Sequence, residues 1–326
     1  MPFLTHPAFI WTVVVLAVLL ILFIPFSFVL ASSIIYNKTL RRTSKKQWSR
    51  DVPSTLAPDS VSMYNAGLEW ANENAEFKKD VHTIRDGINL YGEYYDFGFK
   101  RCAVILSGRT EALKYGYYFA IPYHKAGCNI MVLDPRGHGH SDGEFNTVGF
   151  EESRDITRWI NHMHEEYGID KFIYHGICIG AAGGMLSITS DEAPVWVEAI
   201  VTEGMFPCFA ESMKNHLRER RKPVITVKLI DAWMKHYTGH TMTKGPINVI
   251  SKLNRPLLML HSREDTYSTP DNAQKLFDLA GTDMKRIEWF PHGRHSFLRI
   301  TDTERYDNAI MSFVKELDDI KAPASK

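Results

Sequence analysis

The chain has 326 residues, 44% hydrophobic and 23% charged, an ordinary composition for a globular protein that excludes disordered, collagen-like and coiled-coil classes. It is long enough for one large domain or two small ones. The 38 basic residues balance the 38 acidic residues, whereas a general nucleic-acid-binding protein would carry a basic excess. Four cysteines in a chain of this length do not make a disulfide scaffold.

The N-terminal segment is uncharged over a long stretch, from Ala8 to Ile35. A membrane-spanning helix needs roughly 18–20 apolar residues, so we predict a short N-terminus over 1–7 and a transmembrane anchor over 8–35. A buried core helix is disfavoured because the run is uniformly apolar. A signal peptide cleaved near Ala31 is a further alternative, although the run is too long and no Lys or Arg precedes it.

The charge of the next segment predicts the orientation of the anchor. All the charged residues in the first 50 positions are basic and follow the apolar run: Lys38, Arg41, Arg42, Lys45, Lys46 and Arg50. The positive-inside rule then places this side of the membrane in the cytoplasm. We therefore predict a basic juxtamembrane linker over 36–59, able to lie on anionic lipid headgroups, and a cytoplasmic domain over 60–326.

The domain alternates helix-like and strand-like segments. Helices are predicted over 61–76, 115–126, 150–167 and 301–317, and strands over 81–85, 88–95, 102–106, 129–133, 172–177, 197–202, 256–261 and 286–290. Such alternation is typical of an α/β fold in which a mostly parallel sheet has helices on both faces. Residues of about 205–250 break the alternation, and we predict that this long insertion forms a small cap over the site.

The sharpest local motif is Gly-Ile-Cys-Ile-Gly at 176–180, which follows an apolar strand and precedes a helix rich in glycine and alanine. A very tight turn of this kind exposes a nucleophile above the sheet, and flanking glycines avoid the clash that a Cβ would cause. The nucleophile would be Cys178, which can react as a thiolate when a helix N-terminus and a histidine lie beside it. The competing interpretation is a buried packing cysteine flanked by glycines by chance.

Two later residues complete a candidate triad. Asp265 follows a predicted strand at the edge where active sites of parallel sheets gather, and His295 lies in the loop after the last strand. The chain order Cys178, Asp265, His295 is the nucleophile, acid, base order of α/β-hydrolases. His295 would act as base and then acid, with Asp265 orienting its ring. His292 is the rival base.

Two loops complete the motif set. After the strand 102–106, the backbone N–H of Arg109 or Thr110 would form an oxyanion hole together with that of Ile179. The segment 133–143, which reads LDPRGHGHSDG, fits a sharp structural loop. His138 and His140 have a metal-like spacing, but no further ligand pattern accompanies them. We expect no metal and no cofactor, because the chain has neither a phosphate-binding glycine loop nor a dense Cys/His cluster.

Together these motifs resemble the α/β-hydrolase superfamily over residues of about 80–320. The segment beginning at Ser107 is similar to the serine aminopeptidase-like and monoacylglycerol lipase/lysophospholipase-like branch. Two departures stand out. Most of that branch has serine at the elbow, whereas this chain has Cys178, which resembles dienelactone hydrolase in this respect. In addition, Ser107-Gly108 replaces the usual His-Gly. The resemblance implies the α/β-hydrolase fold and acyl-transfer chemistry, without a particular substrate.

The expected function is a membrane-anchored hydrolase that cleaves a carboxylic ester, thioester or lactone through an acyl-cysteine intermediate. Acyl transfer or peptidase action through the same intermediate is one alternative, and a catalytically inactive binding protein is another. Its partners would be a small-molecule acyl substrate, lipid-like substrates included, and the membrane. Apolar cap residues suggest an acyl pocket, although they equally fit the core of the cap: Phe206, Phe209, Met213 and Trp233.

Overall fold

The computed structural model describes residues 7–44, 48 and 58–319. Within them, eight strands form one sheet in the order β1-β2-β4-β3-β5-β6-β7-β8. The strands are β1 Lys78–Arg85, β2 Ile88–Tyr95, β3 Arg101–Leu106, β4 Asn129–Leu133, β5 Lys171–Ile177, β6 Val197–Glu203, β7 Leu257–Ser262 and β8 Lys285–Phe290. β1 pairs with β2, and β2 with β4, in antiparallel register. The other six strands, β3 to β8, are parallel to one another. The carboxyl ends of those six strands therefore share one edge.

Helices cover both faces of the sheet, as the alternation predicted. They are α2 Pro58–Glu73, α3 Gly116–Lys125, α4 Phe150–Tyr167, α5 Ile179–Ile188, α8 Pro270–Leu279, α9 Leu298–Thr301 and α10 Thr303–Asp319. Short 3₁₀ turns occupy η1 Ala75–Phe77, η2 Leu113–Tyr115, η3 Pro246–Asn248 and η4 Ile250–Lys252. α2, α3 and α10 pack on one apolar core, and α4, α5 and α8 on the other.

Two helices differ from the sequence-based expectation. α8 was not predicted, although Thr269 followed by Pro270 is a helix-start signal and the helix buries Ala273 and Leu276. The closing helix predicted over 301–317 is present as α10, but it begins two residues later, because Asp302 leaves the helical region with φ −148° and ψ 82°. The short α9 before this break begins three positions after His295, so the break belongs to the loop that presents that histidine.

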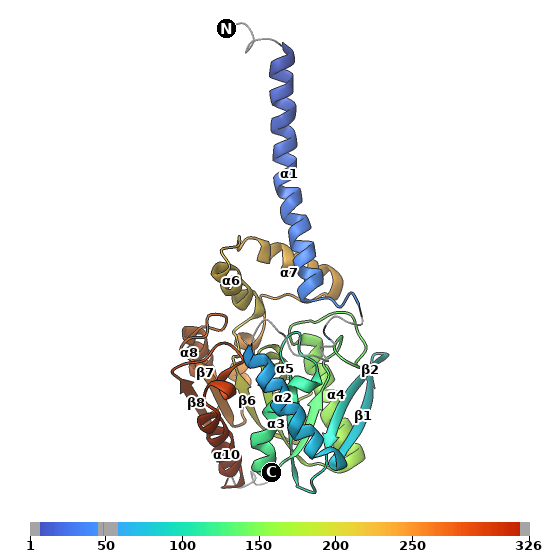
Figure 1. The fold of residues 1–326 in the computed structure, drawn as a ribbon, viewed down its shortest axis with the longest axis vertical. Helices are drawn as coiled ribbons and strands as arrows, with labels where there is room; N and C mark the ends of the chain where they lie inside the picture. Colours follow the sequence, from blue (N-terminus) through green and yellow to red (C-terminus); the bar gives the residue numbers. More distant parts are fainter. Residues whose placement is uncertain (1–6, 45–47, 49–57, 320–326) are drawn as a thin grey trace.

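The first helix, α1 Pro7–Thr39, projects away from the domain (Figure 1). Its most apolar 18-residue window is 0% buried, so it does not behave as a core helix, and it is long and apolar enough to cross a membrane. Pro25 lies inside the helix without ending it. Its length and composition fit a membrane anchor and equally a signal sequence.

The end of α1 differs from the predicted juxtamembrane linker. The helix continues to Thr39, and both Tyr36 and Leu40 are fully buried against the domain. Arg41 forms an ion pair with Glu144, so this cation contacts the domain. The cause is tertiary: the aromatic and aliphatic side chains after residue 35 find apolar partners in the domain. Residues 45–47 and 49–57 of the predicted linker lie outside the described residues.

Two helices fill the insertion between β6 and β7. α6 Phe209–Glu219 and α7 Thr226–Thr238 lie between the sheet and the projecting part of α1 (Figure 1). Both helices have one apolar face, which is buried in a third apolar cluster shared with Tyr36, Leu40 and Ile179. The insertion therefore packs at the carboxyl edge of the sheet.

Candidate active site

Cys178 lies on a strained turn between β5 and α5. Its backbone has φ 54° and ψ −110°, a conformation that costs free energy in any residue with a side chain. The neighbouring glycines allow this turn. A Cβ at Gly180 would lie 2.0 Å from the Leu106 carbonyl oxygen, and one at Gly176 would lie 2.4 Å from the Ala181 Cα. The turn thus has the geometry that the motif predicted, and Cys178 is the least buried of the four free cysteines.

Asp265 and His295 meet at the same edge of the sheet. The His295 Nδ1 atom lies 2.7 Å from Asp265 Oδ2, within hydrogen-bonding distance. The other carboxylate oxygen, Oδ1, accepts the backbone N–H groups of Tyr267 at 2.8 Å and Ser268 at 2.9 Å. Asp265 is buried, so these bonds fix the carboxylate, and the carboxylate in turn orients the imidazole.

The charges of the site stabilise one another. Burial alone would lower the pKa of His295, but the Cys178 sulfur and the Asp265 carboxylate outweigh it and raise this pKa well above its usual value. Burial alone would raise the pKa of Asp265, but the His295 charge and the hydrogen bonds lower it. The arrangement therefore favours a charged imidazolium that lies between the Asp265 carboxylate and the Cys178 sulfur.

The rival histidine points elsewhere. His292 is exposed, and its Nδ1 atom lies 2.9 Å from a carboxylate oxygen of Glu264 at the protein surface. It therefore contacts a different acid from His295, although the two histidines belong to one short loop. Between the two candidates that the sequence left, the geometry brings His295 to Asp265 and Cys178.

The predicted oxyanion-hole residues are only partly brought together. The Thr110 N–H donates to the Gly108 carbonyl at 3.2 Å, so it closes a turn inside its own loop. Ile179 is the first residue of α5, where backbone N–H groups have no partner within the helix. A Cβ added at Gly108, the residue before Arg109, would lie 3.8 Å from the Cys178 Cβ. Arg109 and Ile179 therefore fit the role better than Thr110 does.

Two residues at the end of β6 were missed by sequence reasoning. The Glu203 carbonyl accepts the Cys178 N–H at 2.9 Å, and its carboxylate accepts the Leu298 N–H at 3.2 Å. Gly204 has φ +60°, and a Cβ there would lie 2.8 Å from His295 Cε1. Glu203 thus braces both the elbow and the histidine loop, while Gly204 makes room for the imidazole. A Glu-Gly pair directly after a buried strand was the available signal.

Glu203 belongs to a buried polar chain beneath the site. The Tyr306 hydroxyl donates to the Glu203 carboxylate at 2.6 Å and lies 3.2 Å from His175 Nε2. The Tyr123 hydroxyl lies 2.9 Å from the other His175 ring nitrogen. Burial raises the pKa of Glu203 to about 7 and lowers that of His175 to about 3, so His175 is neutral near pH 7.

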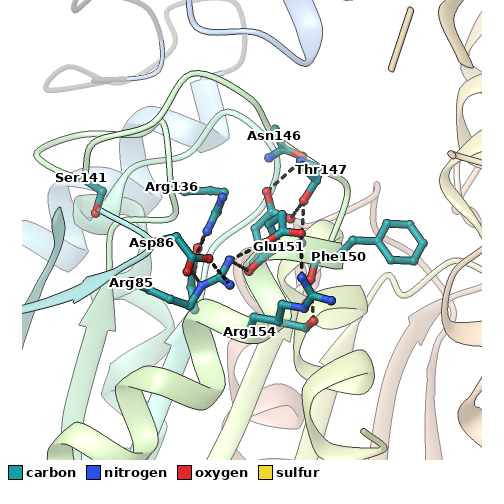
Figure 2. Close-up of polar contacts among 12 residues, drawn as sticks. Arg85, Asp86, Arg136, Ser141, Asn146, Thr147, Phe150, Glu151 and Arg154 are labelled. Carbon is teal, nitrogen blue, oxygen red and sulfur yellow. Dashed lines mark hydrogen bonds and ion pairs between the residues drawn. The ribbon is translucent and has the colours of Figure 1, made fainter. Parts of the chain in front are cut away.

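The loop after β4 has structural contacts throughout. Asp134 accepts the backbone N–H groups of Leu113 and His140, both at 2.8 Å. Arg136 makes a two-bond pair with Asp155, each bond 2.6 Å. Figure 2 shows Arg136 beside Arg85, which pairs with Asp86 and Glu151. This network holds the loop in place.

Two histidines near this loop are held by stacking and polar contacts. His138, one of the pair with metal-like spacing, is fully buried, stacks on Trp48 with ring centroids 4.8 Å apart, and places Nδ1 2.9 Å from the Arg136 carbonyl. His240 stacks on Phe150, with its Nε2 atom 2.8 Å from Glu151. Among the described residues, no group of three or more His, Cys, Asp or Glu is placed to hold a metal ion.

The cap residues that the sequence named as substrate contacts are mostly buried. Phe206, Phe209 and Met213 are 1%, 5% and 8% exposed and pack in the cluster that Cys178 borders. Trp233 faces α1, because its Nε1 atom donates to Ser32 Oγ at 3.1 Å. The first three residues therefore lie on the side of the nucleophile, whereas Trp233 joins the cap to α1.

No protein-family model matches the chain. A sequence relative, Uncharacterized protein YqkD of Bacillus subtilis, is 24% identical over 225 residues, which cover 67% of this chain and 71% of the relative. The esterase Pf2001 of Pyrococcus furiosus superposes with a TM-score of 0.63 at 18% identity, over 76% of this chain and 94% of that one. The esterase EaEST of Exiguobacterium antarcticum gives 0.55 at 14% identity, over 73% and 99%.

The chain has the α/β-hydrolase fold. This confirms the fold class predicted from the strand–helix alternation and from the motif resemblance. Identities this low establish the architecture only. The reaction that the site can support depends on the side chains that the fold brings together.

Proposed function

We propose that this chain is a membrane-anchored hydrolase that cleaves a carboxylic ester, thioester or lactone through an acyl-cysteine intermediate. The observation that carries the proposal is the 2.7 Å contact between His295 and Asp265, formed beside a cysteine on a strained, glycine-flanked elbow. An inactive binding protein has no need to hold a buried carboxylate, an imidazole and a strained nucleophile together. Strain of this kind persists where function requires it.

Acylation would begin with attack of the Cys178 thiolate on the carbonyl carbon. The carbonyl electrons move to oxygen, and the backbone N–H groups of Ile179 and Arg109 stabilise the oxyanion. His295, protonated and held by Asp265, then gives its proton to the leaving alcohol, thiol or ring oxygen as the scissile bond breaks. The products are the free leaving group, or its tethered form for a lactone, and an acyl-cysteine.

Deacylation would use the same groups in reverse order. The now neutral His295 takes a proton from water as the water oxygen attacks the thioester carbonyl. The tetrahedral intermediate collapses, the Cys178 thiolate leaves, and the carboxylic acid is released. An amine or an alcohol in place of water would give acyl transfer, the alternative with the same intermediate. Phe206, Phe209 and Met213 pack in the apolar cluster that borders Cys178, which favours an apolar acyl group.

The nucleophile is tested by replacing Cys178 with alanine. We expect purified Cys178→Ala to lose turnover on ester and thioester panels and to lose the acyl adduct detected by intact-protein mass spectrometry, with an unchanged circular dichroism spectrum. Cys208→Ala is the matched control, because Cys208 is a buried cysteine of the neighbouring cap. Wild-type turnover by Cys178→Ala would refute the assignment, and product analysis with added amines and alcohols separates hydrolysis from transfer.

The anchor and its orientation are part of the same proposal. The long apolar run of α1 and the one-sided basic flank support an orientation in which the catalytic domain is cytoplasmic. We expect a protease added outside intact cells to leave residues 51–326 uncut. Permeabilised cells are the control, since the same protease should then digest the domain. Digestion in intact cells would contradict this orientation.

A further inference from the structure

The connection between α6 and α7 has an unusual surface. Together with the last turn of α6 it concentrates four cations, namely Arg218, Arg220, Arg221 and Lys222, and all four are exposed. Beyond Pro223, Val224 and Ile225 are 38% and 51% exposed. None of the ion pairs among the described residues uses these four cations, although Glu219 lies among them. Exposed aliphatic side chains beside clustered Arg and Lys are typical of a segment that contacts an anionic membrane surface.

This connection lies on the side of the domain from which α1 leaves (Figure 1). α7 runs beside the end of α1: Trp233 donates to Ser32 at 3.1 Å, and Tyr237 stacks on Tyr36 with ring centroids 5.5 Å apart. Those contacts lie at the end of the stretch of α1 whose apolar side chains are exposed. A bilayer crossed by α1 would therefore meet the cap first, and the connection with it.

We propose that residues 218–225, called here the cap tip, contact the headgroup region of the anionic lipid bilayer that α1 enters. The cations would bind lipid phosphates, while Val224 and Ile225 would insert at the headgroup–acyl boundary. The proposal goes beyond catalysis and rests only on the anchoring part of the proposed function. It assigns the cap tip a membrane contact separate from the basic flank of α1, of which Arg41 pairs with Glu144 in the domain.

The test measures lipid proximity of a label in the full chain. Ile225→Cys in a Cys178→Ala background would carry a bimane fluorophore, because the other three cysteines are buried. The protein is placed in nanodiscs of phosphatidylcholine, with or without phosphatidylglycerol, and quenched by lipids with a nitroxide near the headgroup. The matched control is Val195→Cys, which is 74% exposed and precedes β6 at the opposite edge of the sheet. Leu20→Cys, within the apolar run, reports whether α1 is inserted.

We expect strong quenching at position 225 and none at 195 in discs that contain phosphatidylglycerol. Replacing Arg220, Arg221 and Lys222 with glutamate should reduce the quenching at 225 about twofold or more, since each cation contributes to the attraction. Equal quenching at 225 and 195 while position 20 is quenched would overturn the proposal. Absence of quenching at position 20 would overturn its premise, the anchor. Neither result depends on turnover. The ester assay tests the catalytic assignment, so a failure of that assignment is distinguished from a failure of the membrane contact.

Discussion

Cys178, Asp265 and His295 come from three turns at the carboxyl ends of parallel strands, whereas the surface next to them is assembled from α6, α7 and the last turns of α1. We call the first region the floor of the site and the second the roof. The floor is held by short hydrogen bonds and by glycines with no space for a Cβ. The roof is held mainly by apolar packing.

The floor and the roof therefore have different tasks: the floor holds the reacting groups, and the roof attaches the domain to its anchor. Floor contacts act on the reacting groups, so a change there should alter the rate of bond cleavage. Roof contacts join the anchor to the domain, so a change there should alter stability and leave the chemical step intact. The following experiments test that division, beginning with the largest effect.

His295→Ala should cost about 10³-fold or more in kcat/KM, because the variant lacks both the base and the acid of the proposed mechanism. The matched control is His292→Ala, which removes an exposed histidine that contacts Glu264 in the same loop. That control should retain most activity. Steady-state kinetics on one soluble thioester compares the two. An essential His292 with a dispensable His295 would break the assignment of the floor.

Glu203→Gln should change how stability depends on pH. The folded-state pKa of Glu203 is raised to about 7 by burial, above its ordinary value of 4.5. Between these values the unfolded chain releases the proton while the folded chain keeps it, so stability falls as pH rises. At pH 8 this costs the wild type about 3 kcal/mol relative to pH 4, a loss that glutamine avoids.

Thermal unfolding from pH 5 to pH 8 measures this effect as the difference between wild type and Glu203→Gln. We expect the relative stability of the variant to increase with pH across this range. A constant difference would show that Glu203 does not titrate there. Glu165→Gln is the matched control, since Glu165 is an exposed carboxylate on α4.

Ser32→Ala should have the smallest effect, about 1 kcal/mol of stability, because it removes the hydroxyl that accepts the Trp233 N–H. Ser27→Ala is the matched control: each serine donates to a backbone carbonyl three residues earlier at 2.7 Å, but Ser27 is exposed. Thermal unfolding in detergent should separate the two variants, while kcat on a soluble thioester stays at the wild-type value for both. A loss of kcat in Ser32→Ala would mean that roof and floor are coupled.

Local sequence determined most of the sheet and the floor. Several patterns act over only a few positions: the apolar runs with the strand period, the Asp86-Gly87 turn and the glycines around Cys178. The local structure that they predict therefore does not depend on distant partners. The same holds for the order of Cys178, Asp265 and His295, because the carboxyl ends of parallel strands meet at one edge.

Tertiary packing decided what local patterns left open. The loop sequence left His292 as a rival of His295, and the contact of His295 with Asp265 distinguishes two histidines three residues apart. Glu203 and Gly204 acquire their roles from Cys178 and His295, which are distant in sequence. Likewise, the basic residues after α1 predicted a juxtamembrane linker over 36–59, yet Tyr36 and Leu40 are buried by cap helices about two hundred residues away. Such long-range burial leaves no periodic signal in the segment that undergoes it.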